Sequence, residues 1–285
     1  MADYGKNFVQ LHNHTHYSLL DGASKIPDLA KRAAELEMPA VGITDHGNMH
    51  GAYEMYTNCV ANGVKPIIGI EAYVTPETAR QDKSRVHWGT EAQRRDDVSG
   101  GGLITHLTMW AENDEGLVNL IKASSVANLE GRVMRYPRMD KEVLSTYSKG
   151  VIASSGCPSG IIQTRLRLGQ FDEALRAAGE FQDIFGKDNF FIELMDHGLT
   201  IENQVTDDLL TIAKKLDAPL LATNDSHYVH AEDAGAQDAM LCINSGSRLD
   251  DPDRFKFDGT GYYIKTAEEM RCLLYTSPSP RDAHE

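Results

Sequence analysis

Short runs of apolar and β-branched residues recur along the chain, and most of them are continuous rather than alternating. Continuous apolar runs of this length are typical of strands that are buried on both faces of a sheet. The pattern therefore predicts seven buried strands. They are Phe8–Leu11, Ala40–Thr44, Pro66–Val74, Leu103–Met109, Gly150–Ser154, Phe190–Leu194 and Pro219–Thr223.

Helical patterns lie between these strands. Pro27–Leu36 begins with a proline at a first-turn position and repeats apolar residues at helical spacing. The same spacing occurs in Asp114–Leu129, Phe171–Phe185 and Ile201–Leu216. Because strands that alternate with helices form parallel βα units, a closed barrel is favoured over an open sheet. The predicted fold class is α/β, a distorted (β/α)7 barrel that resembles the TIM barrel.

One segment, Thr75–Gly102, interrupts this alternation. It is polar, contains the charged stretches Gln81–Arg85 and Arg94–Asp97, and ends in Ser-Gly-Gly-Gly. Functional loops of such barrels lie at the ends of strands, so we expect a long mobile insertion after the third strand. An inert, solvated loop is the alternative interpretation.

The composition is that of an ordinary globular protein, with 285 residues of which 41% are hydrophobic and 25% charged. No apolar run approaches the roughly 18 residues of a membrane helix, and Met1–Gln10 lacks a signal region, so we expect a cytoplasmic protein without membrane contact. The four cysteines form no C-x-x-C pair. The net charge of -14 argues against a broad basic surface, although bound metal ions would reverse the field locally.

Residues that can bind metal ions occur at or near the ends of six of the seven predicted strands. In barrels of this kind, catalytic groups come from the ends of several strands. Each residue taken alone has a simpler explanation than metal binding: a histidine can be a hydrogen-bonded core residue, a cysteine a small buried apolar residue, and a glutamate one half of a buried ion pair. Together they predict a metal site, because independent accidents would not follow the strand ends. The candidates are His12, His14, Asp21, His46, Glu71, His106, Cys157, Asp225 and His227.

The segments that carry these residues resemble the PHP (polymerase and histidinol phosphatase) domain found at the N-terminus of bacterial replicative DNA polymerase III alpha subunits, most closely those of the actinobacterial type. The similar segments are LHNHTHYSLLDG, GITDHGNM, KPIIGIEAYV, SSGCPSG, FIELMDHG, ATNDSHYV and RFKFDGTGYYIKTAEEM. The resemblance extends from Phe8 to Arg271. It implies a phosphoesterase domain over residues 1–245 and the beginning of a connection to the polymerase body over 246–271.

The resemblance also implies a set of metal ligands and their chemistry. Nine positions match, and all nine have kept metal-binding residues: His12, His14, Asp21, His46, Glu71, His106, Cys157, Asp225 and His227. Among them, Asp21, Asp225 and His14 are expected to be catalytic. The family implies three divalent metal ions, and ligands rich in histidine with one thiolate favour zinc, with manganese or iron as alternatives.

The implied activity is removal of the 3′-terminal nucleotide of DNA by a proofreading 3′-5′ exonuclease within the chain of a DNA-directed DNA polymerase. The expected partners are the DNA 3′ end (the primer terminus) and, through the full-length protein, the sliding clamp and other replisome subunits. Two alternatives stay open: a free-standing phosphomonoesterase of the histidinol-phosphate type, and a scaffold module without catalysis. The segment Arg254–Met270 argues against the first, and the complete ligand set argues against the second.

The last residues of the chain differ in character from what precedes them. Cys272–Asp282 resembles the translation of a sequencing adapter, and the composition changes there to serine and proline. We therefore expect residues 272–285 to be an artefact, the natural protein to continue differently after Arg271, and neither Cys272 nor His284 to have a role.

Overall fold

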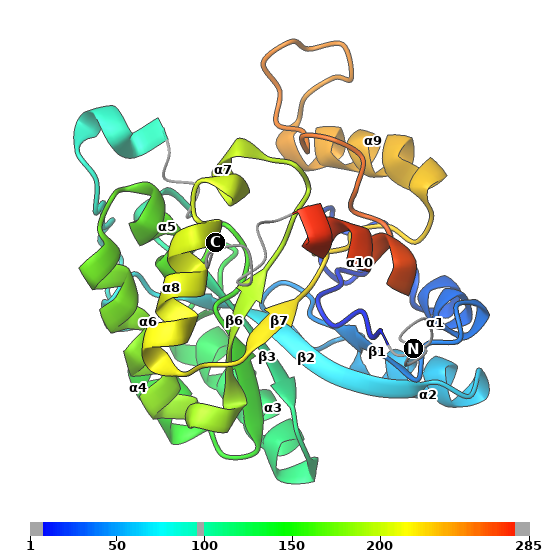
Figure 1. Ribbon diagram of the computed structural model, residues 1–285, viewed down its shortest axis with the longest axis horizontal. Coiled ribbons are helices and arrows are strands. Elements are labelled where there is room, and N and C mark those ends of the chain that lie inside the picture. Colours follow the sequence, from blue (N-terminus) through cyan, green and yellow to red (C-terminus); the bar gives the residue numbers. More distant parts are fainter. Residues whose placement is uncertain (1–7, 96–99, 277–285) are drawn as a thin grey trace, which may run out of the picture. The chain divides into compact units, whose positions relative to one another are not determined.

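The computed structural model describes residues 8–95 and 100–276, and the chain divides into two compact units (Figure 1). The first unit contains the residues up to 68, 195–199 and those from 222 onward. The second contains 69–194 and 200–221. None of the helices in the described part of the chain is long and apolar enough to cross a membrane.

The first unit is built around short strands and the helices that follow them. β1 pairs in parallel with the first half of β2, from Ala40 opposite Lys65 to Ile43 opposite Ile68. Its elements are α1 (Ile26–Glu35), β1 (Ala40–Ile43), α2 (Ala52–Ala61), the first half of β2 (Lys65–Val74), the 3₁₀ helix η5 (Ala231–Asp233), α9 (Ala234–Ser245) and α10 (Ala267–Thr276).

The predicted strand at Phe8–Leu11 is not a regular strand. The Gly42 amide donates a hydrogen bond to the Gln10 carbonyl at 2.8 Å, and the Ser226 amide donates to the His12 carbonyl at 3.1 Å. The segment thus runs extended beside β1 and beside the residues around Ser226. Its backbone hydrogen bonds are divided between these two neighbours and do not form the continuous pairing of a regular β-strand.

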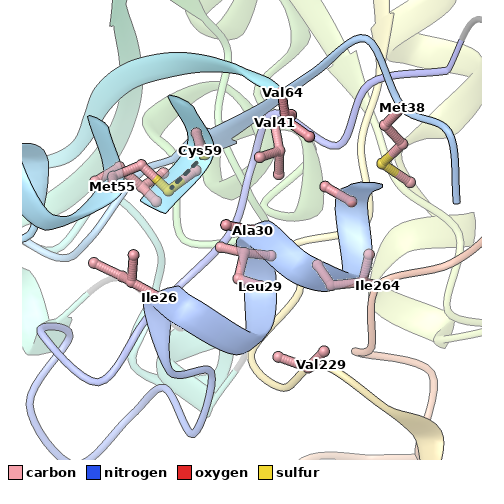
Figure 2. Close-up of a cluster of buried hydrophobic side chains, with 12 residues drawn as sticks. Ile26, Leu29, Ala30, Met38, Val41, Met55, Cys59, Val64, Val229 and Ile264 are labelled. Carbon is pink, nitrogen blue, oxygen red and sulfur yellow. Dashed lines mark hydrogen bonds between the residues drawn. The ribbon is translucent and has the colours of Figure 1, made fainter. Parts of the chain in front are cut away.

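The core of the first unit lies between α1, α2 and β1 (Figure 2). The helix α1 begins at Ile26 with Pro27 in its first turn, and its apolar residues recur at the spacing of one helical face. Buried residues of all three elements, joined by Val229 and Ile264, pack into one cluster. Figure 2 shows this cluster, in which Cys59 lies against Met55. Cys59 is therefore a core residue.

The second unit contains strands in the order β2-β3-β5-β6-β7, with β4 paired to β2. Figure 1 shows α6 and α8 lying side by side against β6. Its elements after β2 are the 3₁₀ helices η2 (Glu91–Arg95) and η3 (Gly100–Gly102), β3 (Thr105–Ala111), α3 (Asp114–Glu130), β4 (Arg138–Met139), α4 (Lys141–Thr146), β5 (Val151–Ser154), α5 (Ile161–Arg167), α6 (Phe171–Phe185), the 3₁₀ helix η4 (Lys187–Asn189), β6 (Phe190–Leu194), α7 (Thr200–Asn203), α8 (Thr206–Leu216) and β7 (Leu220–Ala222).

The direction of β3 differs from the prediction of parallel strands. β3 is antiparallel to both β2 and β5, with Thr105 opposite Val74 and His106 opposite Tyr73. Within the described residues between β2 and β3 there are only the 3₁₀ helices η2 and η3 and no crossover α-helix, and β3 begins at the edge where β2 ends. His106 at the beginning of β3 therefore lies at the same edge as the end of β2.

The described part of the insertion is tied by a few side chains to β4 and α5 of the same unit, although most of its residues from 81 to 93 are exposed. The fully buried Arg138 side chain donates hydrogen bonds to the carbonyl groups of Arg80 and Asp82, both at 2.7 Å, and also to Leu103 and Gly131. The Arg165 guanidinium lies 4.2 Å from the Trp88 ring. Arg138 of β4 thus binds the first part of the insertion and Leu103 just after it, whereas Arg165 of α5 contacts its middle.

Replacing Arg138 with Met should loosen this insertion. The change leaves several buried carbonyl groups without their donor, which we expect to lower the free energy of unfolding by about 2–4 kcal/mol. Limited proteolysis should then cleave within residues 75–102 faster than in the unmodified protein. The control is Arg132→Met, an exposed arginine of the segment between α3 and β4 that donates a hydrogen bond of 3.4 Å to the Met134 carbonyl. Equal cleavage of the two variants would contradict the prediction.

Candidate metal centre

Six of the nine expected ligands lie in the first unit, on segments far apart in the sequence. Two of them, His12 and His14, are fully buried on the extended segment beside β1, and their Nε2 atoms are 3.3 Å apart. Residues two apart in an extended chain point to the same face, which explains their proximity. The first ligand group consists of His12, His14, Asp21, His46, Asp225 and His227.

Asp225, which follows β7, joins the two histidines. Its Oδ1 atom lies 3.3 Å from His12 Nε2 and 3.1 Å from His14 Nε2. Its φ of 43° is in the left-handed region, which aspartate tolerates better than most residues other than glycine. The Asp225 carbonyl accepts a hydrogen bond from His227 Nδ1 at 2.7 Å, so a neutral His227 has its lone pair on Nε2.

Asp21 completes the group. Its Oδ2 atom lies 2.7 Å from His46 Nε2 and 3.6 Å from His227 Nε2. The centre of the His14 ring lies 4.2 Å from that of His46 and 4.4 Å from that of His227. One ring nitrogen from each of these three histidines lies within 4.8 Å of the others, a spacing at which all three could bind one metal ion.

Burial and neighbouring charges set the protonation states. Burial lowers the pKa of His14 to about 3, so this imidazole is neutral. Burial alone would raise the pKa of Asp225, but the neighbouring His12 and His227 hold it well below its ordinary value. Hydrogen bonds from two histidines outweigh burial in the same way and hold the pKa of Asp21 well below its usual range. A neutral imidazole and ionised carboxylates are the forms that bind metal ions.

The tautomer of His14 follows from a hydrogen-bond relay. The Ser18 hydroxyl donates its proton to Asp45 Oδ1 at 2.7 Å, so its oxygen can only accept from His14 Nδ1, 3.0 Å away. Burial raises the pKa of Asp45, and hydrogen bonds from Ser18 and Thr15 oppose that rise. The proton of His14 therefore lies on Nδ1, which leaves the lone pair on Nε2.

These residues fit a bound divalent cation. His14 Nε2 and Asp225 Oδ1 are both electron-pair donors, and they lie only 3.1 Å apart. Two such atoms repel each other unless a proton or a cation lies between them. A pKa of about 3 for His14 excludes the proton at neutral pH. Imidazole nitrogens with carboxylate oxygens are the donor set preferred by zinc and its neighbours.

Removing the relay should weaken metal binding. In Ser18→Ala the His14 ring loses the acceptor that fixes its tautomer, and we expect metal affinity to fall about 10–100-fold, as is usual for partners of ligating histidines. Ser24 provides a matched control, since it is a buried serine of the same segment whose hydroxyl has no hydrogen-bond partner among the described residues. Zinc titration of Ser18→Ala and Ser24→Ala measures the difference, and equal affinities would contradict the role of the relay.

Metal affinity should also rise with pH. Burial alone would lower the pKa of His227, but the charges of Asp225 and Asp21 outweigh it and raise this pKa above the ordinary value. Below the raised pKa, a proton competes with the cation for His227, whereas both aspartates are already ionised. Affinity should therefore increase between about pH 6 and pH 8, by at most about tenfold per unit. Calorimetric titration with zinc across this range checks it, and an affinity independent of pH would contradict it.

The other three expected ligands lie in the second unit and form the second ligand group: Glu71, His106 and Cys157. His106 Nδ1 lies 3.2 Å from Glu71 Oε2 and 3.4 Å from Cys157 Sγ. Glu71 is a buried residue of β2, His106 is the second residue of β3, and Cys157 follows β5. Because β3 is antiparallel, its beginning meets the ends of β2 and β5. A buried carboxylate, an imidazole and a thiol in mutual contact have metal-binding chemistry.

The turn that carries Cys157 depends on two glycines of the segment SSGCPSG and on Gln163, which the sequence did not single out. Gly156 has a φ of 76°, which is strained for residues with a side chain. Gln163 of α5 donates a hydrogen bond to the Gly156 carbonyl at 2.6 Å, and the Gly160 amide donates to the Cys157 carbonyl at 2.8 Å. Gln163 was missed because a glutamine on a helix has no pattern that marks it as a loop anchor.

The described residues at the end of the chain, up to Thr276, belong to neither ligand group. The helix α10 extends through Thr276, and Cys272 is exposed. The remainder of the expected artefact, residues 277–285 with His284, lies outside the described residues.

Comparison with known proteins identifies relatives over most of the chain. A protein of Mycobacterium tuberculosis named DNA polymerase III subunit alpha is 55% identical over 269 residues, covering 94% of this chain and 23% of the relative. The protein of the same name from Saccharopolyspora erythraea is 56% identical, covering 93% and 22%. The chain thus spans less than a quarter of the length of these relatives.

Structural similarity to solved proteins is weaker. The structure of a proposed metal-dependent phosphoesterase from Bifidobacterium adolescentis aligns over 97% of this chain and 98% of its own, with 15% identity and a TM-score of 0.46. A similarity of this size supports no conclusion about activity. The sequence model of the PHP domain, in contrast, matches residues 10–197, which is more than half of the chain. The chain belongs to the PHP domain family.

Proposed function

We propose that this chain is the PHP part of a replicative DNA polymerase III alpha subunit and that it hydrolyses phosphodiester bonds in a metal-dependent reaction. Relatives of that name are 54–56% identical to it. The observation that carries the proposal is the convergence of His14 Nε2 and Asp225 Oδ1 at 3.1 Å in a buried group of imidazoles and carboxylates. This arrangement suits a cation that binds phosphate oxygens.

We propose the nine expected ligands as the residues that hold the metal ions, six in the first ligand group and three in the second. The family resemblance suggests three divalent ions, and the donor set favours zinc, with manganese or iron as alternatives. Three such ions carry six positive charges, whereas the three carboxylates and the Cys157 thiolate carry four negative ones. A net charge of about +2 would attract a phosphodiester despite the acidity of the whole chain.

The side chains of the first ligand group would act by binding and orienting. Bound divalent cations would lower the pKa of a water molecule and neutralise charge on the phosphate. Asp21 and Asp225 stay ionised at neutral pH because their pKa values are depressed. Neutral His14 offers Nε2 while Ser18 holds its other nitrogen. Asp21, Asp225 and His14 are thus prepared to hold cations without first losing protons.

The proposed substrate is the 3′ end of DNA, from which the terminal nucleotide would be removed as proofreading in the chain of a DNA-directed DNA polymerase. A mispaired end is favoured because an unpaired terminus leaves the duplex at lower cost. Through the full-length protein, the sliding clamp and other replisome subunits would be the partners, and the location would be cytoplasmic.

A primer-extension substrate with a 3′ mismatch tests this function. The full-length subunit, loaded with zinc or manganese, should release the mispaired nucleotide as a monophosphate faster than a paired one. Release of inorganic phosphate from a phosphomonoester, without cleavage of DNA, would instead favour the free-standing phosphatase. Absence of both reactions in a protein that contains metal would favour the scaffold.

A further inference from the structure

We propose that a cavity between α9 and the loop 254–260 binds the nucleoside at the 3′ end of the substrate; this inference rests on the function proposed above. The cavity lies within the first unit and has a volume of about 280 Å³. Ligand pockets occupy roughly 300–1,000 Å³, so this cavity is at the small end of that scale and limits the ligand to about the size of a single nucleoside.

The cavity adjoins the first ligand group through two of its lining residues. The Gln237 side chain donates a hydrogen bond from Nε2 to the Asp21 carbonyl at 2.5 Å. The Phe257 ring lies 4.7 Å from the His227 ring, nearly perpendicular to it. Both Gln237 and Phe257 line the cavity. A phosphate bound through cations at the Asp21 and His227 side chains would therefore lie beside the cavity.

Three lining residues match the parts of a nucleotide. Phe257 offers an aromatic ring, and stacking on such a ring accepts every base because every base has a π-face. Gln237 is buried, and its Oε1 has no hydrogen-bond partner within the described residues, so a hydroxyl or amino group of the ligand would satisfy it. Lys256, which is exposed, offers a positive charge to the phosphate.

The loop is held in place before any ligand binds. Arg254 donates hydrogen bonds to both carboxylate oxygens of Asp238 on α9, at 2.5 and 2.6 Å. The Phe257 ring also lies 4.7 Å from the Tyr262 ring, which stacks on His197 at 4.2 Å. Because Arg254 is neutralised by Asp238, Lys256 supplies the available positive charge among the residues that line this cavity. Because the loop is already ordered, it would lose less conformational entropy when a ligand binds.

Calorimetric binding of thymidine 5′-monophosphate to the full chain, with deoxyribose 5-phosphate as the base-free comparison, tests the proposal. Phe257→Leu should weaken thymidine monophosphate about tenfold, the loss expected for a stacking ring. Phe255→Leu is the matched control, because Phe255 lies in the same loop, is 60% exposed and does not line the cavity. Lys256→Ala, a surface change, should weaken thymidine monophosphate and leave thymidine unaffected.

Equal affinity of the Phe257 and Phe255 variants, or equally tight binding of the base-free phosphate, would overturn the proposal. So would a Lys256→Ala protein that binds thymidine monophosphate like the unmodified chain. The result stays distinct from that for the proposed function. Binding that depends on the base, without any cleavage of DNA, would support the proposed nucleoside site and contradict the proposed exonuclease activity. Cleavage of DNA with an unchanged KM in Phe257→Leu would support the exonuclease activity and contradict the proposed nucleoside site.

Discussion

Replacing Asp225 with Asn should reduce metal-dependent release of 3′-terminal nucleotides roughly 10³-fold, because several kcal/mol of charge stabilisation depend on the bound cations. Asn is close to Asp in shape and also tolerates the left-handed backbone at this position. It removes the negative charge that faces His12 and His14 at 3.3 and 3.1 Å. The loss should therefore appear in metal content and in kcat, with little change in the fold.

Asp217 supplies the matched control for this variant. It also has a left-handed backbone, with φ of 49°, but it is exposed and forms an ion pair with Lys187 at 2.6 Å. Asp217→Asn should keep both metal and activity, because exposed ion pairs contribute little to stability. Equal activity of Asp225→Asn and Asp217→Asn on a mismatched primer would contradict the role of Asp225.

Cys157→Ala should remove a metal ligand from the second ligand group. With Co²⁺ in place of the native metal, a thiolate ligand produces a sulfur-to-metal charge-transfer band in the near ultraviolet, and this band should vanish in the variant. Activity should fall roughly 10²-fold or more, the scale of losing part of the electrostatic stabilisation at a metal site.

Cys59→Ala serves as the comparison, since burial raises the pKa of the Cys59 thiol to about 11 and its neighbour is the Met55 sulfur at 3.7 Å. Its loss should cost stability but should leave the Co²⁺ spectrum unchanged. A charge-transfer band that persists in Cys157→Ala would show that the thiolate of Cys157 does not bind the metal.

The family membership confirms the predicted α/β barrel class, and several strands could be read directly from the sequence. β1, β2 and β6 fall within a residue or two of the predicted runs, because strands buried on both faces leave continuous apolar stretches. The direction of β3 could not be read, since a run of apolar residues has the same appearance in either orientation. β4 has only two residues, too few for any pattern.

The helices show a similar limit. α6 has the predicted bounds, whereas the predicted helix at Ile201–Leu216 is divided into α7 and α8. α2 was not predicted because it exposes Tyr53 and Val60, so its apolar residues do not follow a single face. Propensity and spacing thus identify helices whose one face is buried and miss those with apolar residues on their exposed side.

The candidate ligands could be named from the sequence and stay a prediction, and the structure brings them into two groups, but the contacts that support them could not be predicted. His12 and His14 share a face in any extended chain, which the spacing alone shows. The hydrogen bonds that link Asp45 to His14 through Ser18 join residues that only folding brings together. The position of Asp45 at a strand end also does not distinguish its supporting role from the ligand role expected of the adjacent His46. The domain boundaries at residues 245 and 271 stay predictions.

Anomalous X-ray diffraction at the zinc, manganese and iron edges, on crystals of the full chain, tests most directly whether a metal centre exists. We expect anomalous peaks within bonding distance of His14 and Asp225 in the first ligand group, and of His106 and Cys157 in the second. Elemental analysis of the same preparation should give about three ions per chain. Absence of anomalous density at these side chains, in protein that received metal during purification, would contradict the metal centre and the function built on it.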